Sequence, residues 1–373
     1  MRYNYCFYNG VKLFDSKYDI ILEKINSIDP IKYARTRNYK DGDVTKLSPY
    51  ISRGFISTRF IYEKLVENGI NLKKSEKFIQ ELAWRDFWQQ IWVNKSSLIN
   101  KDLKKPQEDV NDFKIAKSLV EAQTGIDSVD SEIRNLYLSG YMHNHMRMYV
   151  ASIATNIAKS HWKVPAKWMY YHLLDGDWAS NSLSWQWVAG SNSSKKYYAN
   201  QDNINKFFYS NQKNTFLDNS YEFISSMNIP KEVQEKCDLE LNSNLLDNKE
   251  IKIDNSLPTL IYNYYNIDPN WRKNEEANRV LIFEPKVFNE YPISQKCIDF
   301  SLNLSKNIKD IQIFYGNFEE LCSNYNLSNL IFKEHPLNNH YSGFEDQRDW
   351  LFKIEGEYLS FFKYWNKIRK KLI

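Results

Sequence analysis

The sequence predicts an α+β multidomain protein in which an all-helical segment is followed by a Rossmann-like parallel α/β domain. Two observations support this fold class. Between residues 75 and 160, large apolar residues recur every three or four positions, which is the period of amphipathic helices. Beyond residue 255, short strand-like runs alternate with helical stretches, as in a parallel sheet covered by helices. The 373 residues are enough for two such domains.

The helical elements follow from this apolar period. "EKFIQELAWRDFWQQIW" places Phe78, Leu82 and Ile91 on one helical face. "DSEIRNLYLSGYMHNHMRMYVASIATNIAKSHW" continues the pattern, and Gly140 is expected to break it into two helices. "PAKWMYYHLL" predicts another short helix. We therefore expect a helical domain over residues 33–210, after an N-terminal extension over residues 1–32.

The second half changes in character. Residues 211–255 are polar and rich in Asn, which predicts a linker or irregular region. Four strand-like runs follow in "LPTLIYNYYNID", "NRVLIFEP", "DIQIFYGN" and "NLIFKEH". Between them, "SQKCIDFSLNLSKNI" and "FEELCSNYN" read as helices, the first with Ser294 as its N-cap. An α/β domain over residues 256–373 is the result.

The composition excludes several classes of protein. A chain that is 42% hydrophobic and 26% charged is globular rather than disordered. No apolar run approaches the roughly 18 residues of a membrane span, and the first residues have no signal core. The four cysteines form no CxxC pair, so we expect reduced thiols, no metal site and a cytoplasmic location. A net charge of +4 allows a local phosphate-binding face without establishing one.

Two helical faces combine polar and large apolar groups. In "GYMHNHMRM", Asn144, Arg147 and Met148 share one face, as expected for a binding surface or a partly exposed helix. In "QELAWRDFW", Glu81, Trp84, Arg85 and Trp88 do the same. Glu81 and Arg85 are spaced for a surface ion pair, but the two indoles beside them favour the wall of a cleft.

The segment "DGDVTKLSPYISRG" suits a phosphate group. Thr45 and Ser48 flank Lys46 just before a predicted helix, and hydroxyls, an ammonium group and helix N-terminal amides all bind anions. The alternative is ordinary N-capping by Ser48, with Pro49 at the first helical position.

In this order and spacing, these segments resemble the flavin-binding domain of the DNA photolyase and cryptochrome family, from about Tyr33 to Lys206. The most specific parts are "TGIDSVDSEIRNLYLSGYMHNHMRMYVAS" and "WMYYHLLDGDWASNSLSWQW". They are close to the family patterns TG-x-x-x-VD, G-W-M-H-N-R-x-R-M and DGD-x-A-x-N-x-x-x-WQW. The helical segment is thus expected to be a photolyase-type FAD-binding domain.

The resemblance implies a set of FAD contacts. Arg147 should pair with Asp175 beside the flavin ring, and Asn181 should face flavin N5, where an amide is similar to the repair enzymes. In the phosphate loop, Val44 replaces the family's usual Thr, so one hydroxyl is lost. The residues at the family's cofactor positions are Tyr33, Arg37, Thr45, Lys46, Leu47, Ser48, Phe78, Arg85, Asn144, Arg147, Asp175, Asp177 and Asn181.

The resemblance also implies an electron path. Trp185 and Trp162 match the inner and middle tryptophans that carry electrons to the flavin. The outer position falls near Asp109, where this chain has no Trp. A Tyr, another Trp such as Trp168 or Trp178, or a different exit would then be needed.

A lesion pocket is implied as well. Trp84 and Trp187 match the pair that grips a flipped pyrimidine dimer, and Glu81 matches the carboxylate that hydrogen-bonds it. Asn144 and Met148 match the cyclobutane-dimer enzymes, whereas (6-4) photolyases carry histidines at both positions. We therefore assign Glu81, Asn181, Trp185 and Trp162 catalytic roles, and assign substrate contacts to Glu81, Trp84, Asn144, Met148 and Trp187.

The C-terminal half resembles the family's antenna domain, which usually precedes the flavin domain. "IQIFYGNFEEL" and "GEYLSFFKYWNKI" are similar to a central stretch and to the end of that domain, which suggests a circularly permuted arrangement. No motif in this half identifies a second, antenna chromophore. It lacks a GxGxxG motif, so nothing supports a dinucleotide site there.

The sequence therefore predicts a light-dependent deoxyribodipyrimidine photo-lyase that uses FAD to split cyclobutane pyrimidine dimers in DNA, and we expect it to be a monomer. The alternative is a cryptochrome-like blue-light sensor without repair activity. A light-independent flavin or nucleic-acid binder is the third class. Repair is favoured by the set Glu81, Trp84, Asn144, Met148, Asn181 and Trp187.

Overall fold

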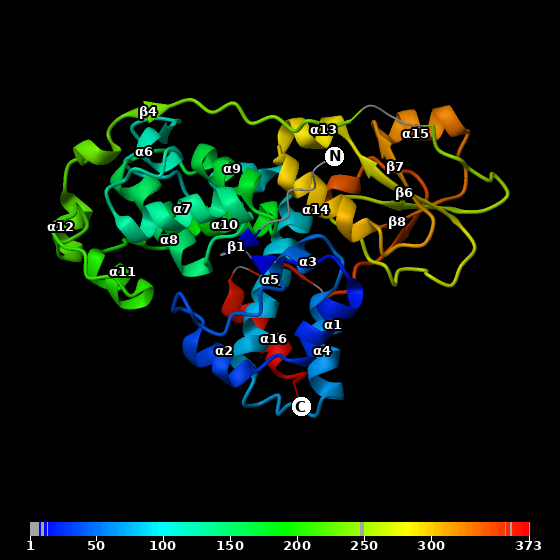
Figure 1. The fold of residues 1–373 in the computed structure, drawn as a ribbon, viewed down its shortest axis with the longest axis horizontal. Coiled ribbons are helices and arrows are strands. Elements are labelled where there is room, and N and C mark those ends of the chain that lie inside the picture. The colour runs from blue at the N-terminus through cyan, green and yellow to red at the C-terminus, as the bar shows by residue number, and fades with distance from the viewer. Residues whose placement is uncertain are drawn as a thin grey trace. The chain divides into compact units, whose positions relative to one another are not determined.

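The computed structural model describes residues 7–8, 11–12, 14–246, 250–354, 356–358 and 360–372, so Cys6 lies outside it. The chain forms two compact units, each assembled from separate stretches of sequence (Figure 1). The helical unit comprises Met1–Leu13, Asp29–Val44 and Asn94–Leu241. The mixed unit comprises Phe14–Ile28, Thr45–Val93 and Asn242–Ile373. The domain boundaries expected from the sequence stay a prediction.

In the helical unit, α10 packs against both α8 and α9, and α7 packs against α8 (Figure 1). Two short antiparallel pairs, β1 with β2 and β3 with β4, complete it. Its elements are β1 (Phe7–Tyr8), β2 (Val11–Lys12), α2 (Pro30–Thr36), η1 (Ser96–Asn100), β3 (Ile115–Ala116), α6 (Lys117–Val120), α7 (Asp127–Ser139), α8 (Asn144–Ser152), η2 (Ile153–Ile157), α9 (Lys163–His172), α10 (Trp178–Ala189), α11 (Gln201–Phe208), α12 (Tyr221–Ser226), η3 (Lys231–Val233) and β4 (Lys236–Cys237).

The predicted break at Gly140 is confirmed. Gly140 ends α7 with φ 72°, a left-handed conformation that glycine adopts without strain. A Cβ atom at this position would lie 2.6 Å from the side chain of Leu174. The start of α7 is fixed by Asp130, whose Oδ1 accepts hydrogen bonds from the Thr124 amide (2.8 Å) and hydroxyl (2.7 Å). The "TGIDSVD" stretch thus has a structural role in shaping the entry to α7.

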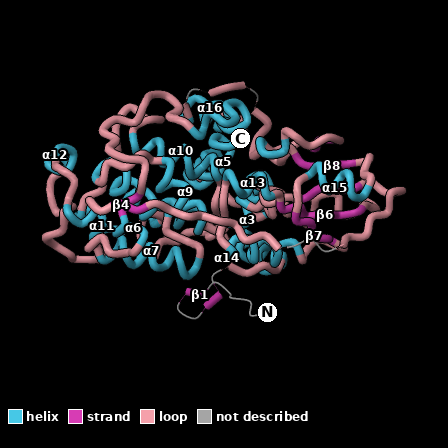
Figure 2. Tube along the Cα trace, turned by 90° about the horizontal axis from the view of Figure 1, so that it is seen from above, coloured by secondary structure: helices cyan, strands magenta, loops and turns pink. Residues whose placement is uncertain are grey.

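The mixed unit contains a five-stranded parallel sheet in the order β7-β6-β5-β8-β9. This confirms the predicted fold class, helical followed by α/β. Figure 2 draws the strands of the sheet in magenta, among them β6, β7 and β8. The unit's elements are α1 (Tyr18–Asn26), α3 (Ser48–Ser52), α4 (Thr58–Glu67), α5 (Glu76–Lys95, in this unit up to Val93), β5 (Thr259–Tyr262), β6 (Asn278–Phe283), α13 (Pro285–Glu290), α14 (Gln295–Ser305), β7 (Ile311–Tyr315), α15 (Phe318–Tyr325), β8 (Leu330–Lys333), η4 (Pro336–Asn338), β9 (Phe344–Asp346) and α16 (Phe361–Arg369).

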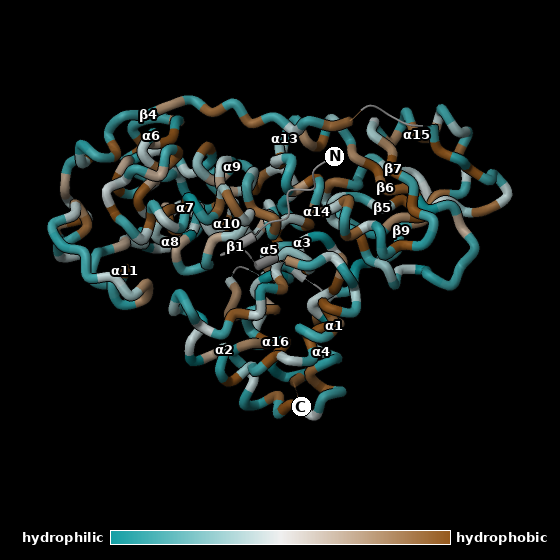
Figure 3. Tube along the Cα trace, viewed as in Figure 1, coloured by the Kyte–Doolittle hydropathy of each residue, from teal (hydrophilic) through white to brown (hydrophobic). Residues whose placement is uncertain are grey.

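The sheet is buried at its centre, where every residue of β5 and β6 is enclosed. Such continuous burial explains why residues 260–262 and 280–283 are apolar without alternation. Figure 3 labels both strands and colours them by hydropathy. Helix α15 covers one face through Phe318 and Leu321, which belong to the same core cluster as Ile261 and Val280. Among the described residues, no helix is both long and apolar enough to cross a membrane.

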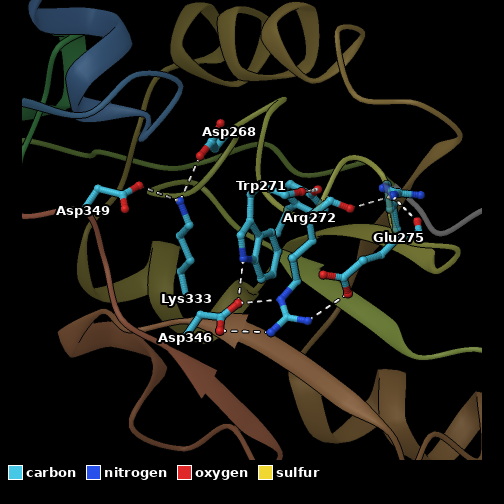
Figure 4. Close-up of polar contacts among 9 residues, drawn as sticks. Asp268, Trp271, Arg272, Glu275, Lys333, Asp346 and Asp349 are labelled. Carbon is cyan, nitrogen blue, oxygen red and sulfur yellow. Dashed lines mark hydrogen bonds and ion pairs between the residues drawn. The ribbon is translucent and has the colours of Figure 1, made fainter. Parts of the chain in front are cut away.

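The fifth strand, β9, is absent from the sequence prediction. It has only three residues, two of them exposed, so it lacks the apolar run that marks its neighbours. Polar contacts hold it in place (Figure 4). Asp346 accepts hydrogen bonds from Arg272 Nε (2.7 Å) and Nη2 (3.1 Å) and from Trp271 Nε1 (2.9 Å). This network ties the segment after β5 to the edge of the sheet.

Two predicted helix starts differ in detail. Ser294 occupies the N-cap position of α14, but its hydroxyl makes no capping bond and lies 3.4 Å from Cys297 Sγ. Helix α3 begins at Ser48 with Leu47 in the N-cap position and no side-chain cap. Ser48 is therefore not the N-cap, and the capping interpretation of this residue is wrong.

The chain after β9 packs on α5 through a buried carboxylate. Asp86 is enclosed, and it accepts hydrogen bonds from the Leu351 amide (2.6 Å) and the Thr58 hydroxyl (2.8 Å). Burial raises the pKa of Asp86 to about 6, although these hydrogen bonds oppose the shift.

We expect Asp86 to make the protein less stable as the pH rises from about 4 to about 6. In this window the folded state keeps a proton that the unfolded state has released, so the free energy of unfolding falls by up to about 1.4 kcal/mol per pH unit. Denaturant titrations at both ends of the window should give a steeper loss for the wild type than for Asp86→Asn. Equal slopes would contradict the assignment.

Candidate functional site

A buried ion pair stands at the centre of the helical unit's candidate site. Arg147 of α8 places Nη2 2.9 Å from Asp175 Oδ2, and its Nε donates to the Met142 carbonyl at 2.9 Å. The Asp175 side chain is 4% exposed and that of Arg147 is 19% exposed. Asp175 lies in the turn between α9 and α10, which brings the "DGD" motif against α8. The ion pair expected from the sequence is therefore present.

Helix α10 carries the next two candidate residues. Asp177 is its N-cap, and Oδ1 accepts a hydrogen bond from the Ser180 amide at 2.7 Å. One turn later, Asn181 donates from Nδ2 to the Ala166 carbonyl at 2.8 Å. Because a carbonyl can only accept, this contact fixes which amide atom is nitrogen. Among the described residues, Oδ1 of Asn181 has no hydrogen-bond partner, so it is available as an acceptor.

The predicted phosphate loop, Thr45–Ser48, belongs to the mixed unit. Lys46 adopts a left-handed backbone with φ 52°, unusual for a residue with a side chain. Burial lowers the pKa of Lys46, and no carboxylate of the described chain forms an ion pair with it. A partly desolvated ammonium group that lacks a protein counter-charge is suited to bind an anion.

The other residues of the phosphate loop, Thr45, Leu47 and Ser48, carry no charge. Thr45 Oγ1 accepts a long hydrogen bond, 3.4 Å, from the Leu47 amide, and Leu47 is buried. Further along the mixed unit, Phe78 is buried in α5, and Arg85 Nη2 donates to the Ser52 hydroxyl at 2.8 Å.

Two candidate substrate residues on α5 already have partners within the mixed unit. Glu81 Oε1 lies 2.7 Å from Lys77 Nζ. The indole of Trp84 stacks on the ring of Phe361, with centroids 3.6 Å apart and planes inclined by 7°. Sequence analysis did not single out Phe361, because 276 residues separate it from Trp84.

The predicted site residues fall in both units. That they assemble into one site stays a prediction. The helical unit holds Tyr33, Arg37, Asn144, Arg147, Met148, Trp162, Asp175, Asp177, Asn181, Trp185 and Trp187. The mixed unit holds Thr45, Lys46, Leu47, Ser48, Phe78, Glu81, Trp84 and Arg85.

The tryptophans of the helical unit differ sharply in exposure. Trp162 and Trp185 are buried, and Trp162 Nε1 donates to Asp102 at 2.7 Å. Trp168 and Trp178 are buried too, so neither offers a surface exit for electrons. Trp187 is 39% exposed. At the expected outer position, Asp109 is exposed and pairs with Lys196 at 2.7 Å.

Sequence analysis missed the role of Gln186, which lies between Trp185 and Trp187. Its Oε1 accepts from the Leu103 amide at 2.9 Å, and its Nε2 donates to the Ile99 carbonyl at 2.8 Å. The side chain is fully buried. The only feature of the sequence that could have indicated this role is an amide side chain between two tryptophans. Local spacing could not predict its partners, because they lie more than 80 positions away.

Comparison with known proteins places these residues in a family. Residues 78–237 match the model described as the FAD binding domain of DNA photolyase. A deoxyribodipyrimidine photo-lyase of Alkalihalophilus pseudofirmus is 32% identical over 148 residues, covering 39% of this chain and 31% of the relative. A cryptochrome DASH of Danio rerio is 33% identical over 166 residues, covering 42% of this chain and 32% of the relative.

The chain thus spans about a third of the length of these relatives. A solved cryptochrome of Synechocystis sp. PCC6803 superposes loosely, with a TM-score of 0.46 and 22% identity over 55% of this chain and 45% of that one. The residues that match the family model include the "DGD" turn, α8 and α10, which hold the Arg147–Asp175 pair, Asn181 and Trp187. Residues 78–237 of the chain are thus similar to the FAD-binding domain of the DNA photolyase and cryptochrome family.

Proposed function

We propose that the chain is a deoxyribodipyrimidine photo-lyase, which uses light and FAD to split cyclobutane pyrimidine dimers in DNA. The observation that carries this proposal is Trp187. It is 39% exposed at the end of a helix whose other tryptophans are buried. An exposed indole is poorly explained by packing, but it is what a stacking platform for a base requires.

The residues present fit FAD in three respects. Lys46 is a partly desolvated cation that forms no ion pair with a carboxylate of the described residues, which suits a pyrophosphate. The Arg147–Asp175 pair presents a fixed, buried dipole. The open Oδ1 of Asn181 could accept a hydrogen bond from a protonated ring nitrogen. Bound FAD would supply the photoexcited electron donor; the protein's contribution is to hold it and to orient the substrate.

The substrate would be held by stacking. Turning a base out of the duplex costs a few kcal/mol, least for a damaged base. Stacking on indoles such as Trp84 and Trp187 would offset this cost by roughly 1–3 kcal/mol per base. Glu81 would accept hydrogen bonds from the base edges, and Asn144 and Met148 would line the remaining surface.

A cryptochrome-like light sensor is the second candidate. The ion pair of the exposed Asp109 with Lys196 favours it, because Asp109 stands at the expected outer position of the electron path and is not an oxidisable side chain. A member that cannot easily re-reduce its flavin from the surface is less suited to sustained repair. A light-induced change in partner binding without repair would select this alternative.

The sheet supports the further proposal that residues 256–373 are a relocated antenna domain. The strand order β7-β6-β5-β8-β9 is that of a doubly wound domain, whose ligands bind beyond the carboxyl ends of the strands. An absorption band that remains after FAD is accounted for would identify a second chromophore.

The decisive experiment combines spectroscopy and repair on one sample. Purified protein should show a flavin spectrum, and after reduction and blue or near-ultraviolet illumination it should restore thymine-dimer DNA. Bound flavin without repair on single- or double-stranded substrate would exclude the photo-lyase.

Trp187→Ala should weaken binding of dimer-containing DNA by roughly 5- to 150-fold, the loss of about 1–3 kcal/mol of stacking, while FAD stays bound. Fluorescence anisotropy and the flavin spectrum measure the two effects separately. Phe223→Ala is the matched control, since Phe223 is an exposed aromatic residue of the same unit. Equal loss of DNA and FAD would contradict the assigned role.

A further inference from the structure

The stack of Phe361 on Trp84 occupies a face that a base would use. The ring centroids are 3.6 Å apart and the planes are nearly parallel at 7°. This separation is that of two rings in direct contact, so no base can enter between them. Any base that stacks on this face of Trp84 must first displace Phe361.

Phe361 is held by the α5 side of the mixed unit. It is 2% exposed and also meets the ring of Phe87 edge-on at 5.7 Å. Further along α16, Tyr364 OH accepts a hydrogen bond from Gln90 at 3.4 Å, and Arg369 Nε lies 2.9 Å from Glu76. The C-terminal helix is thus anchored along α5, from Glu76 to Gln90.

The anchoring is uneven along α16. Phe361 is the first residue of the helix, and Ser360 in the N-cap position makes no side-chain capping bond. Tyr364 and Ile368, which follow one and two turns later, are fully buried. Because uncapped helix ends open at lower free-energy cost than buried middles, the first turn can release Phe361 while the rest of α16 stays docked.

We propose that Phe361 is a placeholder for the lesion base: it covers Trp84 in the free protein and competes with the dimer for the same indole face. This inference rests on the proposed function, because it requires Trp84 to stack on a damaged base. Phe361 lies outside the matched FAD-binding region, so the comparisons assign it no role. It would lower affinity for the lesion and keep the indole from open solvent.

The test measures dark binding of the full chain to a labelled oligonucleotide carrying one thymine dimer, with the undamaged oligonucleotide alongside. Phe361→Ala should tighten binding of the dimer about two- to tenfold, the factor expected for one aromatic pair, and leave undamaged DNA unchanged. Phe361→Leu keeps most of the apolar volume and should shift in the same direction if the alanine variant folds poorly. Phe362→Ala is the control, since its side chain is 65% exposed.

A double-mutant cycle with Trp84→Ala locates the effect. The gain from Phe361→Ala should vanish in the Trp84→Ala background, because no indole face remains to be uncovered. If folded Phe361 variants bind the dimer no more tightly than wild type, the inference is overturned while the photo-lyase proposal stands. If the wild type itself does not prefer dimer-containing DNA, the proposed function fails and this inference fails with it.

Discussion

Asp175→Ala is expected to lower the free energy of unfolding by about 3 kcal/mol and to remove FAD from the purified protein. The substitution leaves the Arg147 guanidinium in a largely enclosed site without the carboxylate that compensates its desolvation. Removing one partner of a buried pair costs roughly 3–5 kcal/mol, and the partial exposure of Arg147 reduces this figure. Denaturant titration and the flavin absorbance of the same preparation measure the two effects.

Two further variants separate stability from cofactor binding. Asp202→Ala is the control, because the Asp202–Lys213 pair spans 3.3 Å but both side chains are exposed. Such pairs contribute about 0–1 kcal/mol. The double variant Arg147→Met/Asp175→Ala leaves no uncompensated charge, so it should recover part of the stability without recovering FAD. Retention of FAD by Asp175→Ala would show that this pair does not hold the cofactor.

The sequence predicted the parts of the fold that have a local cause. Apolar periods and runs predicted α5 and the strands β5, β6, β7 and β8, and a single glycine predicted the α7–α8 break, because each of these is encoded within at most about 20 neighbouring residues. Strand β9 was not predicted, because its three largely exposed residues form no apolar run. The contacts between Arg272 and Asp346 that hold it join residues that are far apart in the sequence. For Ser294, the N-cap position was predicted correctly, but its side chain does not make a capping hydrogen bond.

The candidate site divides in the same way. Arg147 with Asp175 was predictable because both belong to short motifs that resemble those of the photolyase and cryptochrome family, and that resemblance implies the pair. The contact of Trp84 with Phe361 and the bridging role of Gln186 were not, because each joins distant positions through packing or through backbone groups that carry no residue identity. A motif indicates which side chains bear the chemistry, whereas the groups that orient or cover them follow from tertiary structure.

Gln186→Leu should destabilise the protein by about 2–5 kcal/mol. The substitution keeps a side chain of similar size but leaves the half-buried Leu103 amide and the buried Ile99 carbonyl without the partners they now have. Each buried backbone group left unsatisfied costs roughly 1–3 kcal/mol. Denaturant titration should show the loss, and Gln123→Leu, at an exposed position, should stay within about 0.5 kcal/mol of wild type.

The flavin content of the Gln186→Leu variant makes the result specific. Gln186 holds the η1 segment against α10 and reaches neither of the proposed FAD-contact residues on that helix, Asp177 and Asn181, by any hydrogen bond. The folded fraction should therefore carry as much FAD as the wild type, unlike Asp175→Ala. If the free energy of unfolding is unchanged, water replaces the amide of Gln186. In that case the hydrogen bonds of Gln186 do not stabilise the packing of η1 on α10. If the variant remains folded but loses FAD, Gln186 contributes to cofactor binding and not only to stability.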